Sequence, residues 1–350
     1  MARIPAVQNR LGLDDGQLGL TLLCLSFGAI LAMPSTGWLI RKWGNPLVMR
    51  AAATGLCMTL PILPLAPSMA LLMLALFVFG IAFGLLDVSM NVQAVAVEER
   101  HGLPIMSSFH GVFSVGGLLG AASAGVVAGL GVEPFPHLLV VALLLFVLVT
   151  ATGRYLLDTK ARQGEGSAFA LPTRSLLGLG VLGFCVLLAE GAVADWSAVY
   201  LENVLGSSAA IAAAGYAAFS LAMAAMRFAG DALTLQIGPV WMVRAGGLLA
   251  GLGLGGALLI DTVPAMVIGF MGMGIGLAAA FPIALSAAGR TPGLAPGAAI
   301  GAVTTAGYTG LLTGPAFIGF IAEGVGLRAA MMVVAVLSLL SAALGGAVRR

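Results

Sequence analysis

One acidic and one amide side chain stand out within a long apolar stretch of the chain. Asp87 and Asn91 are one helical turn apart within Gly80–Glu98, and Gly80 and Gly84 fall on the same side of a helix. The glycines would let a neighbouring helix approach closely, and the polar groups would then lie within a membrane. Polar and charged groups at that depth are costly, so the spacing predicts a functional site. The alternatives are an acid hydrogen-bonded only for packing, or a helix end nearer to water.

The chemistry predicted for this site is proton binding. A carboxylate is costly to ionise away from water, so Asp87 is the first candidate to bind a proton in one cavity state and release it in another. Glu190, midway along another apolar segment, is the second candidate for proton coupling. The alternative for Glu190 is a hydrogen bond to a neighbouring helix without titration. Asn91 is expected either to bind a substrate hydroxyl or to satisfy a backbone carbonyl.

Four further residues are candidates for lining a substrate site. His110 has the chemistry of a proton relay, although a structural histidine is an equal alternative. Asp195 and Trp196 lie toward the end of the segment that carries Glu190, where tryptophan also serves as an interface anchor. Tyr308 is a weaker candidate for the same lining.

The composition identifies an integral membrane protein. Of 350 residues, 60% are hydrophobic and 9% are charged, the mean hydropathy is +1.08, and 50 residues are glycine. Soluble domains carry about 25% charged residues. The net charge of +2 does not suggest nucleic acid. Cys24, Cys57 and Cys185 lie in apolar runs without metal-ligand spacing, so we expect no disulfide, metal or cofactor.

Apolar segments of about 20 residues predict eleven membrane-spanning helices. Of the 16 Lys and Arg residues, all except Arg3, Arg10 and Arg328 fall on one side of these segments. By the positive-inside rule that side, which includes the C-terminus, is cytoplasmic. The predicted spans are Leu18–Leu39, Leu47–Leu65, Met69–Val97, Ile105–Leu130, His137–Leu157, Ser175–Tyr200, Ala209–Gly230, Val240–Ile260, Pro264–Ala288, Gly297–Ala322 and Arg328–Val348.

The chain is predicted to contain two similar halves in the same orientation: residues 1–157, a polar cytoplasmic linker at 158–174, and residues 175–350. A shift of 194 residues places Gly44 on Gly238, and a shift of 192 places Gly80 on Gly272. Such parallel repeats are typical of two-lobed transporters. The same shift leaves the first half without a counterpart of Ser175–Tyr200. We therefore expect a first helix to be missing from a design of twelve.

Several segments resemble the major facilitator superfamily. The stretch Gly37-Trp-Leu-Ile-Arg41-Lys42-Trp-Gly44 is similar to the family's signature loop after the second helix, although the family usually has Asp at Arg41. Arg227 and Asp231, four residues apart near a helix end, predict a surface ion pair that belongs to a gate.

A narrower resemblance concerns the fourth helix of the superfamily fold. Leu86-Asp87-Val-Ser-Met-Asn91 is similar to that helix in the fucose-permease branch, where an acid and an Asn face a central cavity. The stretches Ala2–Ala6, Glu190–Ser197 and His110-Gly111 resemble bacterial inner-membrane members of this branch. The resemblance covers essentially the whole chain.

The residues and the resemblance together predict an all-α transporter rather than an enzyme. We expect a monomer in the bacterial inner membrane that moves a small polar solute, such as a sugar, together with a proton by alternating access. The chain has no Walker lysine motif, HExxH or GxSxG. One alternative is a proton-driven exporter of drugs or metabolites with the same fold. The other is a truncated membrane protein that does not transport.

Overall fold

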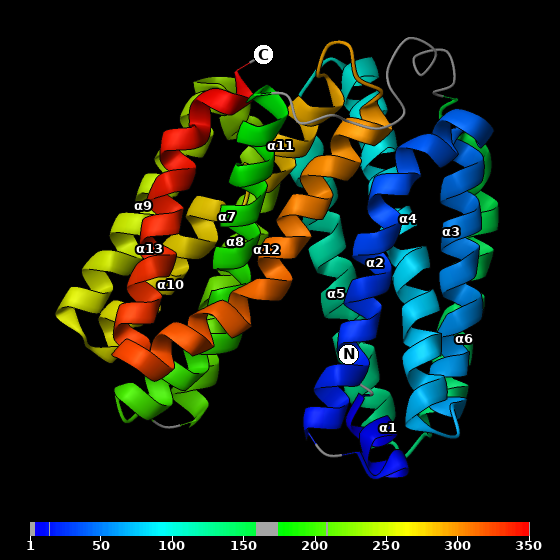
Figure 1. The fold of residues 1–350 in the computed structure, drawn as a ribbon, viewed down its shortest axis with the longest axis horizontal. Coiled ribbons are helices and arrows are strands. Elements are labelled where there is room, and N and C mark those ends of the chain that lie inside the picture. The colour runs from blue at the N-terminus through cyan, green and yellow to red at the C-terminus, as the bar shows by residue number, and fades with distance from the viewer. Residues whose placement is uncertain (1–3, 14, 159–173, 208, 350) are drawn as a thin grey trace. The chain divides into compact units, whose positions relative to one another are not determined.

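A computed structural model describes residues 4–13, 15–158, 174–207 and 209–349 of the chain. Every regular element in these ranges is helical (Figure 1). The predicted linker at 158–174 falls almost entirely outside the described residues. The longer helices are α1 (Ile4–Leu11), α2 (Asp15–Trp43), α3 (Asn45–Thr59), α4 (Met69–His101), α5 (Met106–Gly129), α6 (Pro134–Thr152), α7 (Arg174–Val199), α8 (Ala209–Ile237), α9 (Pro239–Ile260), α10 (Val263–Leu277), α11 (Ala280–Gly289), α12 (Pro296–Val325) and α13 (Leu327–Ala343). The short ones are η1 (Leu60–Leu65), η2 (Gly153–Tyr155), η4 (Tyr200–Val204) and η5 (Leu344–Val348).

The lengths and composition of these helices fit a membrane protein. Within the described ranges, nine helical segments are long and apolar enough to cross a bilayer, the longest being Met69–His101. The two remaining predicted spans coincide with α5 and α12, which are 24 and 30 residues long. Phe27, Leu144 and Phe320 are among many large apolar side chains that are more than half exposed, as expected of residues that face lipid.

One predicted span is interrupted in the structure. The segment predicted as Pro264–Ala288 forms α10, which ends at Leu277, and α11, which begins at Ala280. Pro282 explains the break, because it has no backbone N–H to donate to the carbonyl of Ala278, four residues earlier. The predicted span itself is present, because Val263–Gly289 is long and apolar enough to cross a bilayer, and it is built from two helices.

The repeat predicted from the sequence has a counterpart in the backbone. Gly44 precedes α3 with φ 84° and ψ 147°, and Gly238 precedes α9 with φ 81° and ψ 155°. This region of φ strongly favours glycine. A proline follows within two residues in both cases and starts the helix. The two turns that the shift of 194 residues superposes are thus built in the same way.

The chain forms two compact units. Unit 1 comprises residues 1–97, 113–170 and 292–301, and unit 2 comprises residues 98–112, 171–291 and 302–350. Each unit therefore contains one short piece of the half that the sequence assigned to the other unit: residues 98–112 belong to unit 2, and residues 292–301 belong to unit 1. The beginning of α5 belongs to unit 2, and the beginning of α12 belongs to unit 1.

Close helix contacts in both units involve the glycines that the sequence singled out. In unit 1, a Cβ added at Gly80 would lie 2.0 Å from the carbonyl oxygen of Leu25, and one at Gly84 would lie 2.5 Å from that of Ala29. The predicted close approach of a neighbouring helix is thereby confirmed, and the neighbour is α2 (Figure 1). In unit 2, a Cβ at Gly276 would lie 2.2 Å from the oxygen of Gly246, on α9.

Candidate functional site

The candidate acid of unit 1 lies deep in the longest span. Asp87 is the nineteenth of the 33 residues of Met69–His101 and is 5% exposed. It follows Gly84 by three residues and therefore lies close to the crossing of α4 with α2. Asn91 is also buried, and its side-chain amide donates a hydrogen bond of 2.8 Å to the Asp87 carbonyl. This contact is the second of the two roles expected for Asn91, the satisfaction of a backbone carbonyl.

The candidate acid of unit 2 is paired with an arginine. The Nη2 atom of Arg227, on α8, lies 3.3 and 3.4 Å from the two carboxylate oxygens of Glu190, on α7. Their side chains are 14% and 26% exposed, respectively. Glu190 therefore contacts a neighbouring helix, as one of the two expectations stated, and its partner is a cation.

His110 lies beside this pair on α5. The His110 ring meets that of Phe281 edge-on, with centroids 6.2 Å apart. The positive charge of Arg227 acts electrostatically on His110. The backbone approaches closely here, because a Cβ at Gly111 would lie 2.9 Å from the ring of Phe228. His110 thus links α5 to Phe281 of α11 by a ring contact and lies within the electrostatic influence of Arg227 on α8.

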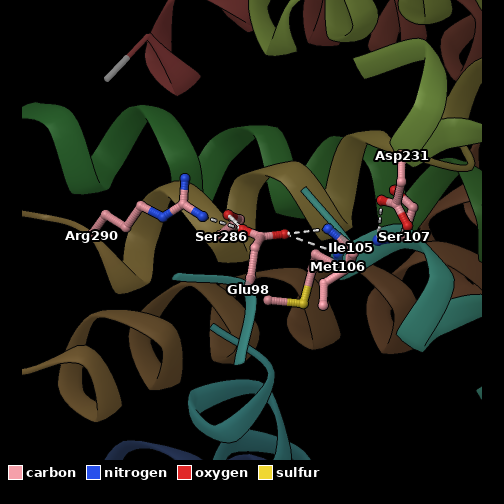
Figure 2. Close-up of polar contacts among 7 residues, drawn as sticks. All are labelled: Glu98, Ile105, Met106, Ser107, Asp231, Ser286 and Arg290. Carbon is pink, nitrogen blue, oxygen red and sulfur yellow. Dashed lines mark hydrogen bonds and ion pairs between the residues drawn. The ribbon is translucent and has the colours of Figure 1, made fainter. Parts of the chain in front are cut away.

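The beginning of α5 is held by a carboxylate from α8 (Figure 2). The backbone N–H of Ser107 donates to Asp231 Oδ1 at 2.9 Å, and that of Ser108 donates to Oδ2 at 2.7 Å. The first turn of a helix has N–H groups without intrahelical partners and a partial positive charge. Asp231 satisfies two of these groups and is itself buried, with 9% of its surface exposed.

A second carboxylate holds the same helix end from the other side (Figure 2). Glu98, near the end of α4, accepts hydrogen bonds of 2.9 Å from the N–H groups of Ile105 and Met106 through Oε2. Its Oε1 accepts from the hydroxyl of Ser286 and from the guanidinium of Arg290. The start of α5, the end of α4 and the last turns of α11 are therefore joined by one polar cluster, which we call the α5 cluster.

The expected surface pair of Arg227 and Asp231 is wrong. The two residues are four apart on α8, but the structure gives them different partners: Glu190 for Arg227 and the α5 amides for Asp231. Both side chains are largely buried. A spacing of four residues allows a pair on an isolated helix, whereas here the neighbouring helices offer each group a better-placed partner.

The signature-like loop lies at the end of α2. A Cβ added at Gly37 would lie 2.7 Å from the backbone nitrogen of Ala298, so the glycine lets α2 pack directly on the beginning of α12. Arg41 is exposed, and the ammonium of Lys42 lies 5.1 and 5.2 Å from the ring centroids of Trp38 and Trp43.

The two halves treat equivalent helix starts differently. The shift of 194 residues places Gly37 on Asp231. The glycine meets the first turn of α12 backbone to backbone, and the aspartate meets the first turn of α5 with its carboxylate. In the second half, this position therefore supplies a negative charge that opposes the partial positive charge at the start of α5. In the first half, it supplies no charge to the start of α12.

The remaining predicted lining residues lie on α7 and α12. Asp195 is exposed, and Trp196 is half-buried against α12, where a Cβ at Gly319 would lie 3.3 Å from its ring. Tyr308 is half-buried. Among the described residues, no group of three His, Cys, Asp or Glu side chains is arranged to hold a metal ion.

A second polar cluster, at the opposite end of α9 from Gly238, was missed from the sequence. The hydroxyl of Tyr200 donates to Asp261 at 2.6 Å, and Arg328 lies 3.3 Å from the same carboxylate. Asp261 has φ 58° and ends α9. Glu98, Ser286 and Arg290 were missed as well. Their only signal in the sequence is that Glu98 and Arg290 are 192 residues apart, the shift that superposes Gly80 on Gly272.

Comparison with known proteins identifies the family to which this helical membrane protein belongs. The family model of the Major Facilitator Superfamily matches residues 1–239. An uncharacterized MFS-type transporter of Yersinia pestis is 41% identical over 347 residues, covering 99% of this chain and 90% of the relative. The chain belongs to the major facilitator superfamily.

Solved structures agree with the fold. The E. coli fucose:proton symporter FucP has a TM-score of 0.76 at 14% identity, covering 100% of this chain and 94% of that one. The proton:xylose symporter XylE, bound to 6-bromo-6-deoxy-D-glucose, has a TM-score of 0.73 at 13% identity, covering 98% and 90%. The prediction of an all-α membrane protein with the major facilitator fold is confirmed.

Proposed function

We propose that this protein is a proton-coupled secondary transporter that moves a small polar solute across the bacterial inner membrane by alternating access. The observation that carries the proposal is the burial of Asp87 near the middle of a 33-residue apolar span. Ionisable groups at that depth are rare and mark ion or substrate pathways. Protonation of Asp87 removes a charge from the pathway and thereby favours the switch between outward-facing and inward-facing states.

Further residues have supporting roles in the proposal. Glu190 is proposed as the second proton-coupling residue. Its carboxylate forms an ion pair with Arg227, and protonation would remove the negative charge from that pair. His110, Tyr308, Asp195 and Trp196 are proposed to line the substrate pathway. The proton and a small solute are the ligands, and the protein acts as a monomer.

The cytoplasmic gate is proposed to include the signature-like loop at Gly37, Arg41, Lys42 and Gly44 together with Asp231. Hydrogen bonds to helix N-terminal amides can break and re-form without covalent change, which suits a latch between transport states. The excess of basic residues on this side supports a cytoplasmic location for the loop and for the C-terminus.

The structural neighbours support proton coupling and a sugar-like substrate by analogy. FucP and XylE are described as fucose:proton and proton:xylose symporters. Their identity with this chain is 14% and 13%, so the likeness itself supports only the fold. The proposals for the coupling ion and the substrate rest on the residues named above.

The test uses proteoliposomes that contain the purified protein and an internal pH-sensitive dye. Sugars and small organic acids are added one at a time, and a transported solute acidifies the lumen in the wild type. Asp87→Asn should abolish this acidification and uphill accumulation while sparing exchange of labelled solute. Glu202→Gln, a change of an exposed acid, is the matched control. A mutant Asp87→Asn that still concentrates the solute would show that Asp87 does not couple the proton.

A further inference from the structure

Two arginines of unit 1 meet at the turn that follows α6. Gly153 and Arg154 begin η2, directly after α6, and Arg50 lies in the second turn of α3. Helix α3 packs against α6 (Figure 1), and a Cβ added at Gly153 would lie 2.8 Å from Cδ of Arg50 and 3.3 Å from its Cγ. The stem of Arg50 therefore lies directly on the backbone of Gly153, one residue before Arg154.

Contacts within their own segments orient both arginine side chains. The Nε of Arg50 donates a hydrogen bond of 3.1 Å to the carbonyl of Pro46. The Nη2 of Arg154 donates one of 2.7 Å to the hydroxyl of Tyr155, and the guanidinium carbon lies 4.8 Å from the centroid of that ring. Both arginines and Tyr155 are exposed, and no carboxylate in the described ranges forms an ion pair with either arginine. Two oriented positive charges are therefore presented at this turn.

An exposed apolar surface leads from this turn along α6 and α3. Leu144 and Leu148 on α6 are 65% and 56% exposed, and Leu47, three residues before Arg50, is 50% exposed. Leu148 precedes Arg154 by six residues, which is about 9–10 Å along the helix axis. A charged end followed by an apolar flank at this spacing matches the headgroup and the acyl chains of a phospholipid.

The second half of the chain shows which part of this arrangement is common to both units. Arg244, 194 residues after Arg50, packs on Gly345 in the same way, since a Cβ added at that glycine would lie 2.7 Å from Cγ of Arg244. A shift of 192 residues, however, places Gly346 on Arg154. The packing of an arginine stem on a glycine is therefore a feature of the repeat, whereas the arginine beside it is an addition in unit 1.

We propose that Arg50 and Arg154 bind the phosphate of an anionic phospholipid, with its acyl chains along the exposed faces of α3 and α6. The planar guanidinium suits the oxygens of a phosphate, and anionic lipids of the cytoplasmic leaflet attract basic residues at the ends of spans. Tyr155 has the amphipathic character of residues that lie at the headgroup level. A zwitterionic lipid carries a cation close to its phosphate and gains less from two arginines. The inference goes beyond the proposed transport and does not depend on it.

The test measures thermal stabilisation of the purified full-length protein in detergent by added lipid. The probe is dioleoylphosphatidylglycerol, and dioleoylphosphatidylcholine, with the same chains and no net charge, is its counterpart. The anionic lipid should stabilise the wild type at the lower concentration. One arginine near an anionic headgroup is expected to change the affinity about fivefold, so Arg50→Gln/Arg154→Gln should bind the anionic lipid about 30-fold more weakly. Glycerol 1-phosphate, which has the headgroup chemistry without the chains, should not stabilise the protein.

Two further variants separate a built site from general positive charge. Arg100→Gln/Arg349→Gln removes two exposed arginines of unit 2 from the same side of the spans and should change the affinity less than about twofold. Gly153→Ala keeps every charge but places a methyl group against the stem of Arg50, so it should weaken binding toward the fivefold loss expected of Arg50→Gln. The melting temperature of each variant without lipid checks that it is folded.

The outcomes decide the lipid site independently of transport. Equal losses of affinity in the two double variants, or wild-type affinity in both Arg50→Gln/Arg154→Gln and Gly153→Ala, overturn the site. Equal stabilisation by the anionic and the zwitterionic lipid overturns it as well. Stabilisation by glycerol 1-phosphate as large as that by the anionic lipid would indicate a site for a soluble phosphate in place of a lipid. Proton movement in proteoliposomes is measured separately, so a failure of the lipid site leaves the transport proposal standing.

Discussion

Replacing Asp231 by Asn or Ala tests how the start of α5 is held. The carboxylate accepts two backbone hydrogen bonds, of 2.9 Å from Ser107 and 2.7 Å from Ser108. Hydrogen bonds to a charged group contribute about 1.5–3 kcal/mol each, and a negative charge at a helix N-terminus adds about 0.3–1 kcal/mol. Asn keeps one acceptor oxygen and loses the charge, so Asp231→Asn should cost about 2–3 kcal/mol of local stability, and Asp231→Ala somewhat more.

Amide hydrogen exchange measures this loss where it occurs. Local opening free energies set the exchange rates of protected amides, and 1.4 kcal/mol corresponds to about tenfold. Peptides covering residues 105–112 should therefore exchange about 30- to 150-fold faster in Asp231→Asn. Peptides from α9 should be unchanged, and Asp261→Asn, at the other polar cluster of unit 2, should leave residues 105–112 as in the wild type. Rates within about twofold of wild type at Ser107 and Ser108 in both Asp231 variants would refute the reasoning.

Two other predictions concern packing and hydrogen bonding. Gly80→Val should destabilise the protein by about 3 kcal/mol or more in reversible unfolding, because the added carbon atoms meet the backbone of Leu25. Gly116→Ala, inside α5 with open space around it, should leave the stability unchanged or raise it by about 0.5–1 kcal/mol, and a loss there as large as at Gly80 would contradict the role given to the helix crossing. Tyr200→Phe should lower the stability by about 1–3 kcal/mol in the same assay through loss of the 2.6 Å hydrogen bond to Asp261, and an unchanged midpoint would show that this contact contributes nothing.

The sequence predicted the helices and their close contacts well because those depend on local patterns. Apolar runs of sufficient length set the spans, and Gly80 and Gly84 lie where α2 and α4 meet. The interruption between α10 and α11 follows from Pro282, but a proline in an apolar run does not by itself show whether a helix bends or stops.

The polar contacts were harder to predict because they join residues far apart in the chain. Arg227 and Asp231 satisfied a local rule for ion pairs, yet their partners lie 37 and more than 120 residues away. In the sequence, Glu98 is one of several charged residues at the end of a predicted span. Its role depends on the start of α5 and the end of α11, which only folding brings together.

The contact of Glu98 with Arg290 depends on a difference between the two halves of the chain. These residues are 192 positions apart, as are Gly80 and Gly272, so each occupies the place in its half that the other occupies in its own. In two identical halves this place would hold the same residue twice, so no pair of opposite charges could form there. The ion pair therefore requires that the two halves differ at this place. Exchanging the two residues, as Glu98→Arg with Arg290→Glu, would keep one acid and one base but would leave the N–H groups of Ile105 and Met106 without their acceptor, so the exchanged protein should be less stable than the wild type.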